Sequence, residues 1–393
     1  MKYLKSILTF ALLLIIRNGF SQNQVTEPVP AQIIPPFRPE INVQDVRTVL
    51  KAVADWQINM PLKHEPGDWT NGALYAGMVE YAGIAGNEIY YTWLKGIADE
   101  LNWTYFIHDN PLRRYHADDY CVGQSYIELY RKYGDKNMIK PIRAYLDKMI
   151  KDPAKGDLKF VNTKDYWTTQ RWSWCDALFM GPTVWAKMGN VTHKKKYFDF
   201  MYSEYKATTD YLFDKDESLY FRDSGYFTCK EANGTKVFWG RGNGWVFAGL
   251  PVIIRELPAK YEHRDYFIKI YKDMAARLLS LQQPDGSWHA SLLDPASYPN
   301  PEISATSFFI FGFAWGIDNG YLDKDKYLPA VVSGWKAMVS AVWPDGKVGF
   351  IQPVGSDPKA VTREMTEVYG VGGFLLAGTE ICKLIDKGNI IAK

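Results

Sequence analysis

The sequence has 393 residues, a formal net charge of +2 and no long basic block. This balance argues against nucleic acid and anionic membranes as partners. The four cysteines show no CxxC spacing, so the sequence carries no signal for a metal site, and we expect neither a metal nor a cofactor.

The first 22 residues are predicted to be a secretory signal. Lys2 and Lys5 precede an apolar run at positions 7–16, and small or polar residues follow it. The run is too short to span a bilayer comfortably, and no cysteine near it suggests a lipid anchor. We therefore expect an exported protein, placed in the periplasm or outside the cell, without a membrane anchor. The proline-rich residues 23–40 predict an extended arm, and 41–393 a single domain.

Two kinds of helical segment alternate along this domain. One kind is amphipathic and is expected on the surface. Its members are Val43–Asn59, Asn87–Asn102, Asn137–Lys151, Lys194–Phe213, His263–Gln283 and Asp323–Val342. The other kind is rich in glycine, alanine and aromatic residues, with few charges, which is typical of buried helices. Its members are Trp69–Ala85, Asp118–Tyr133, Trp174–Met188, Gly242–Arg255, Glu302–Ile317 and Thr366–Leu384.

Six segments of each kind in strict alternation predict an all-α fold of six helical hairpins, an (α/α)6 barrel. The buried set forms the inner ring and the amphipathic set the outer ring. The loops before the inner helices are rich in Asp, Arg, Trp and His, as at Asp68-Trp69. If the six inner helices point the same way, these loops meet at one end of the barrel, where we expect the cleft. The 14 Trp and 26 Tyr suit sugar stacking there, although packing alone also uses aromatic residues.

Asp176 is the strongest candidate for catalysis. It follows Trp172 and Trp174 at the start of an inner helix. Desolvation by the indole rings raises the pKa of such a carboxyl, while the helix N-terminus favours the anion. A carboxyl balanced between these influences suits general acid/base work. The alternative is that Asp176 caps the helix.

Asp118 and Asp119 form the second candidate site. Two adjacent carboxylates at one helix start cannot both face the barrel axis, and we favour Asp119 as the cleft residue. The alternative is that both are capping residues.

The third candidate is the segment FWGRGNGW at 238–245. Arg241 and Trp245 are four residues apart and share one helical face. An arginine can pair with a sugar carboxylate through two hydrogen bonds, and a tryptophan can stack on a ring. The segment is not a phosphate-binding loop, because no strand precedes it. A buried structural arginine is an equally good interpretation.

Together, these motifs resemble glycoside hydrolase family 105 and its relative, family 88. The resemblance covers nearly the whole chain after the arm and rests on WCDALFM at 174–180, DDYCVG at 118–123, FWGRGNGW at 238–245 and EISATS at 302–307. It implies an (α/α)6 barrel that needs no metal. It also implies an oligosaccharide substrate that ends in a 4,5-unsaturated uronic acid, the sugar left by a polysaccharide lyase.

The resemblance further implies how the residues act. Asp176 donates a proton to C4 of the vinyl ether and then activates the water that adds at C5. Asp119 orients the sugar or the water. Trp239, Arg241 and Trp245 contact the uronate, and Asp118, Trp69 and Trp174 complete the expected binding set. Some relatives carry a histidine where this chain has Phe221 and Arg222, and Arg222 offers a second cation for a bound uronate.

Two other functions fit the same barrel. An inverting glycosidase of saturated sugars would use two carboxylates about 6.5–9.5 Å apart. A non-catalytic, exported sugar-binding protein would bind glycans without consuming the double bond. The sugar next to the uronate is left open by the sequence.

Overall fold

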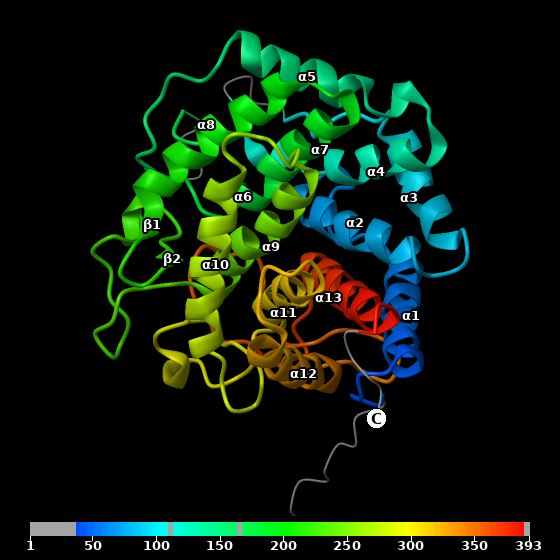
Figure 1. The fold of residues 1–393 in the computed structure, drawn as a ribbon, viewed down its shortest axis with the longest axis vertical. Coiled ribbons are helices and arrows are strands. Elements are labelled where there is room, and N and C mark those ends of the chain that lie inside the picture. The colour runs from blue at the N-terminus through cyan, green and yellow to red at the C-terminus, as the bar shows by residue number, and fades with distance from the viewer. Residues whose placement is uncertain (1–36, 109–112, 163–166, 389–393) are drawn as a thin grey trace, which may run out of the picture. The chain divides into compact units, whose positions relative to one another are not determined.

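The computed structural model describes residues 37–108, 113–162 and 167–388. The predicted signal at 1–22 and most of the predicted arm lie outside these residues. Within them, twelve helices of eleven or more residues alternate between an inner and an outer ring, as the sequence predicts (Figure 1).

The inner ring consists of α2 (Trp69–Ala82), α4 (Gly123–Tyr133), α7 (Pro182–Thr192), α9 (Gly240–Glu256), α11 (Ile303–Asp318) and α13 (Val368–Asp386). The outer ring consists of α1 (Val43–Asn59), α3 (Ile89–Glu100), α5 (Lys140–Lys151), α8 (Lys195–Leu212), α10 (Arg264–Ser280) and α12 (Lys324–Ser340). Each inner helix contacts the next, and α13 returns to α2, so the ring closes. The (α/α)6 barrel is therefore confirmed.

Burial follows the two sequence patterns. In α1 the buried residues form one stripe, including Val46, Val49, Leu50 and Val53, at the spacing of a helix that packs on one side. In α11 every residue from Ile303 to Ile317 is buried, because this helix has neighbours all round. Although α13 is long and apolar enough to cross a membrane, 89% of its apolar window is buried in the barrel, as befits a core helix.

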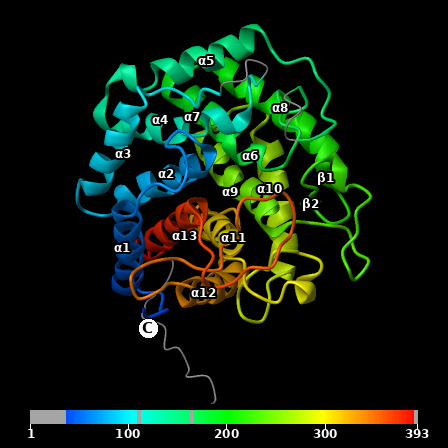
Figure 2. The ribbon, with the colours of Figure 1, turned by 180° about the vertical axis from the view of Figure 1, so that it is seen from behind.

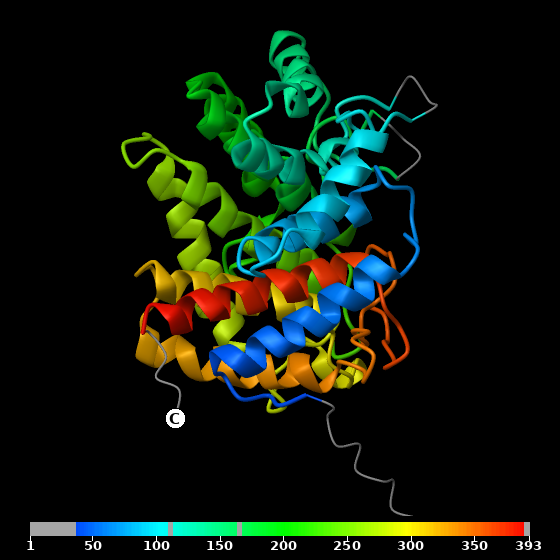
Figure 3. The same cartoon turned by 90° about the vertical axis from the view of Figure 1, so that its right-hand side faces the viewer.

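The seam between the first and last hairpins depends on glycine. Figure 3 shows α1 beside α13, where the start of the described chain meets its end. On the inner ring, a Cβ atom added to Gly77 of α2 would overlap the carbonyl oxygen of Gly372 in α13. A Cβ atom on Gly372 would likewise overlap the carbonyl oxygen of Ala73. The two backbones touch, and only glycine permits this approach.

Two inner helices differ from the prediction because each is broken near its start. The segment expected at 118–133 begins as a 3-10 turn, η1 (Ala117–Tyr120), before α4. The segment expected at 174–188 divides into α6 (Ala177–Met180) and α7. Pro182 has no N–H to donate to the carbonyl of Leu178, so the helix is interrupted at Gly181. A side chain at Gly181 would press on Tyr120 and Trp172.

The loops that precede the inner helices gather at one end of the barrel. Figure 2 brings forward this side of the molecule, with the long orange connection between α12 and α13 crossing it. A small hairpin, β1 (Phe213–Asp214) and β2 (Leu219–Tyr220), follows α8, with Phe213 opposite Tyr220. The segment after β2 runs beside the start of α6, because Trp174 and Asp223 form an antiparallel bridge. This end holds the candidate site.

Candidate active site

A cavity of about 280 Å³ lies at this end, near the lower limit of small-ligand sites. Two indole side chains and two carboxyl groups face it together with one guanidinium. The lining residues are Trp69, Asp118, Trp174, Asp176, Met180, Arg222, Val354, Gly355 and Ser356. Four of the predicted site residues, namely Trp69, Asp118, Trp174 and Asp176, are thus brought together. Apolar faces and few polar groups suit one sugar ring.

Asp176 sits directly before α6, and its side-chain oxygens do not cap that helix. The residue is 8% exposed, and this exposed part faces the cavity. Burial raises the pKa of Asp176, whereas the Arg222 and Arg241 guanidiniums lower it; the net direction is upward. The Nε atom of Arg222 lies 3.6 Å from Oδ2 of Asp176. The carboxyl can therefore hold a proton at higher pH than an ordinary aspartate.

The structure places the two adjacent aspartates in different surroundings. Asp118 lines the cavity, whereas Asp119 is 3% exposed and does not line it. Oδ1 of Asp119 accepts hydrogen bonds from Nη2 of Arg113 at 2.6 Å and from Nε at 3.0 Å. Asp119, which the sequence favours as the cleft residue, is thus directed by the η1 turn to this arginine and away from the described cavity. Burial raises the pKa of Asp118 well above its usual range, and Asp119 and Asp176 raise it further against Arg113.

His116 supports Asp118. Its Nδ1 atom lies 3.6 Å from Oδ2 of Asp118 and accepts a hydrogen bond from the Asp118 backbone N–H at 3.3 Å. Its ring lies 4.6 Å from that of Trp174. Burial lowers the pKa of His116 well below its usual value, so this ring is neutral near pH 7. The sequence shows it only as a histidine two residues before Asp118.

The FWGRGNGW segment holds the wall of the cavity rather than lining it. Arg241 is fully buried, and its Nη1 and Nη2 atoms donate to the backbone oxygens of Gln352 at 2.5 Å and Pro353 at 2.9 Å. Nε1 of Trp239 donates to Oε1 of Gln352 at 3.1 Å. Arg241 and Trp239, which are predicted to contact a uronate, therefore do not line the described cavity; both donate hydrogen bonds to the loop at 352–353.

Other groups fix the same loop. The backbone N–H of Gln352 donates to Oε1 of Glu302, the N-cap of α11, at 3.0 Å. The Tyr369 hydroxyl donates to the backbone oxygen of Gln352 at 2.5 Å. Trp245 is also fully buried and does not line the cavity; its ring lies edge-on beneath Trp69 at 6.0 Å. The anchored loop presents Val354–Ser356 to the cavity, a wall that no sequence motif marks.

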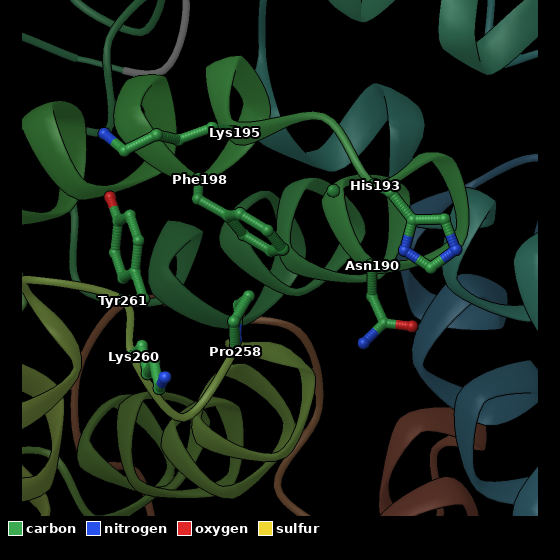
Figure 4. A pocket seen from close by; sticks show the side chains of 8 residues that line it. Asn190, His193, Lys195, Phe198, Pro258, Lys260 and Tyr261 are labelled. Carbon is green, nitrogen blue, oxygen red and sulfur yellow. The ribbon is translucent and has the colours of Figure 1, made fainter.

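A second cavity, of about 340 Å³, lies between the α7–α8 turn and the loop before α10 (Figure 4). Figure 4 shows aromatic and basic side chains around it. Its lining residues are Gly189, Asn190, His193, Lys195, Phe198, Pro258, Lys260 and Tyr261. No carboxylate lines it, so it lacks the acid that the expected chemistry requires. Across the described part of the chain, no group of three His, Cys, Asp or Glu residues has the placement of a metal site.

Comparison with known proteins identifies the family. The profile of Glycosyl Hydrolase Family 88 matches residues 43–385, from the start of α1 almost to the end of α13. The chain belongs to glycosyl hydrolase family 88. Among curated members, it is similar to the unsaturated 3S-rhamnoglycuronyl hydrolase of Alteromonas sp. (strain LOR), with 36% identity over 84% of each chain. The Formosa agariphila protein of the same name is also 36% identical, over 88% of this chain and 92% of its own.

Solved structures share the family 88 barrel. A family 88 glycosyl hydrolase from Bacteroides vulgatus superposes with a TM-score of 0.78 and 30% identity, covering 87% of this chain and 99% of that one. A protein described as a polysaccharide lyase superposes with a TM-score of 0.80 and 30% identity, covering 89% and 99%. The resemblance inferred from the motifs is confirmed, and the chain is a glycoside hydrolase by family.

Proposed function

We propose that this enzyme removes a 4,5-unsaturated uronic acid from the non-reducing end of oligosaccharides. The observation that carries the proposal is the shared cavity of Asp176, Asp118 and Arg222 between the indoles of Trp69 and Trp174. A cavity of about 280 Å³ suits a single terminal ring rather than the middle of a polymer. Since the similar curated proteins are named unsaturated 3S-rhamnoglycuronyl hydrolases, we propose rhamnose as the neighbouring sugar.

The reaction begins with proton transfer. The protonated Asp176 carboxyl gives its proton to C4 of the double bond, and positive charge develops at C5, shared with the ring oxygen. Asp176, now a carboxylate, takes a proton from the water that adds to C5. The resulting hemiketal opens to a ketone at C5, and the hemiacetal left at C1 releases the neighbouring sugar as an alcohol. One carboxyl acts first as acid and then as base, which its raised pKa supports.

Asp118 and His116 position the reactants in this scheme. His116 beside Asp118 is neutral near pH 7 and therefore adds no positive charge to the cavity. Asp118, held against His116, is placed to accept a hydrogen bond from a sugar hydroxyl or from the attacking water. The indoles of Trp69 and Trp174 offer flat faces to the ring.

A lyase is the second candidate, because one similar structure is described as a polysaccharide lyase. The two reactions change the double bond in opposite directions. A lyase creates the conjugated bond and increases ultraviolet absorbance, whereas the proposed hydrolase consumes it.

The test uses both substrate types. Lyase-generated oligosaccharides with rhamnose, galactose or hexosamine next to the unsaturated uronate are incubated with the enzyme, beside their saturated counterparts and the parent polysaccharides. We expect absorbance to fall only with unsaturated oligosaccharides, fastest with rhamnose, and one sugar to be released per double bond lost. Rising absorbance with polysaccharide would favour the lyase. Cleavage of saturated substrates would favour an ordinary glycosidase, and binding without turnover a lectin-like protein.

We also propose that the protein is exported, on the evidence of the charged start and apolar run at 1–22. Expression of the full chain in a Gram-negative host, followed by N-terminal sequencing of the periplasmic and cytoplasmic fractions, tests this. Removal of about 20 residues and recovery in the periplasm are expected. An intact N-terminus in the cytoplasm would contradict the proposal.

A further inference from the structure

Arg222 lines the candidate site and Arg241 lies behind its wall, so the structure gives the two arginines different surroundings. We propose that Arg222 binds the carboxylate of the terminal uronate and so selects an acidic sugar, while Arg241 positions the cavity wall without touching the substrate. The inference rests on the proposed function and names the residue that sets its specificity for an acid.

Arg222 is the arginine that lines the cavity in the described part of the chain. Its backbone is tied to the catalytic segment, because its carbonyl oxygen accepts a hydrogen bond from the Cys175 N–H at 2.7 Å. The next residue, Asp223, forms the bridge with Trp174. This backbone pairing holds the segment that carries Arg222 beside the segment that carries Asp176.

The guanidinium of Arg222 is rigid but has donors to spare. Nη1 donates to Oδ2 of Asp223 at 2.6 Å, and the guanidinium carbon lies 4.8 Å from the centre of the Phe160 ring. The buried Nε atom has no hydrogen-bond partner among the described residues, and the nearest carboxylate oxygen, on Asp176, is 3.6 Å away. A buried donor without a partner is unfavourable, so a carboxylate in the cavity would stabilise it.

The charges of the cavity favour one incoming anion. Burial raises the pKa of both lining carboxyls, Asp118 and Asp176, and so favours their neutral forms. A uronate then meets a guanidinium beside carboxyl groups that can hold protons. Charge-assisted hydrogen bonds between a guanidinium and a carboxylate are about twice as strong as neutral ones, and the fork of an arginine matches the two oxygens.

Arg241 is placed differently: its Nε atom also lacks a partner among the described residues, but the side chain does not line the cavity. It is fully buried, both of its Nη atoms donate to backbone oxygens of the loop at 352–353, and its guanidinium lies between the rings of Trp239 and Tyr369. To bind substrate it would have to release Gln352, and with it the wall at 354–356. It is a positioning residue.

The experiment compares an acid with its neutral ester. The substrates are an unsaturated uronyl-rhamnose disaccharide and its uronate methyl ester. For Arg222→Gln we expect kcat/KM to fall about 100-fold for the acid, as for other truncated buried charge pairs. We expect the loss for the ester to be at least about tenfold smaller, because the ester has no charge for Arg222 to bind, whereas any effect of the variant through Asp176 is common to both substrates. Arg222→Lys should recover part of the loss for the acid. Arg241→Gln should lower kcat/KM for both substrates by the same factor.

Arg277→Gln is the matched control, because Arg277 is an ion-paired arginine of α10, bound to Glu217 and outside the cavity. It should leave both substrates unchanged. Equal losses for acid and ester in Arg222→Gln would overturn the inference, as would selective loss of the acid in Arg241→Gln. Calorimetric binding of both compounds to Asp176→Asn protein gives a second readout, in which Arg222→Gln should abolish the preference for the acid. If the wild-type enzyme consumes neither compound, the proposed function fails instead.

Discussion

The Nε atom of Arg222 lies 3.6 Å from Oδ2 of Asp176, and both side chains are about nine-tenths buried. In the free enzyme, this cation opposes the effect of burial on the carboxyl. A uronate bound to Arg222 would neutralise much of that influence and add a negative charge near Asp176. The substrate would then favour the protonated form of the acid that attacks it.

This relationship predicts that kcat and kcat/KM fall at different pH values on the alkaline side of their pH profiles. Activity requires protonated Asp176, so it falls as pH rises through the pKa of that group, which burial raises above its usual value. The limb of kcat, which reports the bound state, should lie at higher pH than the limb of kcat/KM. In Arg222→Gln, the limb of kcat/KM should move upward, because a group that lowers the pKa is lost. Coincident limbs, or a downward shift in the variant, would contradict the coupling.

The adjacent aspartates predict opposite phenotypes. Asp118 lines the cavity, so Asp118→Asn should lower kcat by about 100-fold or more. Asp119→Asn should lower kcat less than about tenfold, because Asp119 does not line the cavity and so does not contact the reacting groups. It should instead lower the free energy of unfolding by about 1.5 kcal/mol, since it removes charge-assisted hydrogen bonds from Arg113. Steady-state rates and urea unfolding of both variants check this, and a reversed pattern would restore Asp119 as the cleft residue.

Asp118 should also make the enzyme less stable at neutral pH than its asparagine variant. Burial raises the pKa of Asp118 in the folded state, so the folded protein must keep a proton that the unfolded chain releases above about pH 4. The contribution of Asp118 to the free energy of unfolding is fully present below that pH. It is lost as pH rises through the pKa of Asp118 in the folded protein. Asp118→Asn should therefore melt higher than wild type at pH 7, with the difference vanishing below about pH 4. A lower melting temperature for the variant at pH 7 would show that the ionised carboxylate is stabilised instead.

The contact between α2 and α13 predicts the effect of a single methyl group. Gly77→Ala would press a Cβ atom on the carbonyl of Gly372, and should cost about 3 kcal/mol of unfolding free energy. Gly96→Ala is the control, because Gly96 is exposed in α3 with no atom within 4 Å of the added Cβ. It should stabilise by about 0.5–1 kcal/mol. Guanidinium unfolding of the two variants distinguishes them, and similar stabilities would mean that α2 and α13 can separate freely.

The barrel was predictable from the sequence because its two helix types differ in composition and alternate without exception. An amphipathic stripe such as Val46, Val49 and Val53 indicates an outer helix, and a continuously apolar segment such as 303–317 indicates an inner one. The breaks at Gly181 and after Tyr120 were not predicted. They follow from Pro182 and from the 3-10 turn of η1. Both are local features, and the apolar pattern of the sequence continues through them.

Asp176, Trp174 and Trp69 were predictable as cavity residues because each stands at the start of an inner helix. The choice between Asp118 and Asp119 was not, since neighbouring residues of a turn diverge and only the position of Arg113 decides which one faces inward. The surroundings of Arg241 were not predictable for a similar reason. Its partner, Gln352, lies 111 residues further along the chain in a segment with no motif, and no local pattern reveals that the two Nη atoms of Arg241 donate to this loop.

Proton transfer from Asp176 to the double bond is the central step of the proposed reaction, and rapid proton NMR in D2O tests this step directly. With wild-type enzyme and an unsaturated uronyl disaccharide, we predict that the vinyl signal disappears as the neighbouring sugar is released, and that the first-formed product carries one deuterium at C4. Asp176→Asn should slow both events together by about 1,000-fold. Release of the sugar with the double bond intact, or near-normal turnover by the variant, would contradict it.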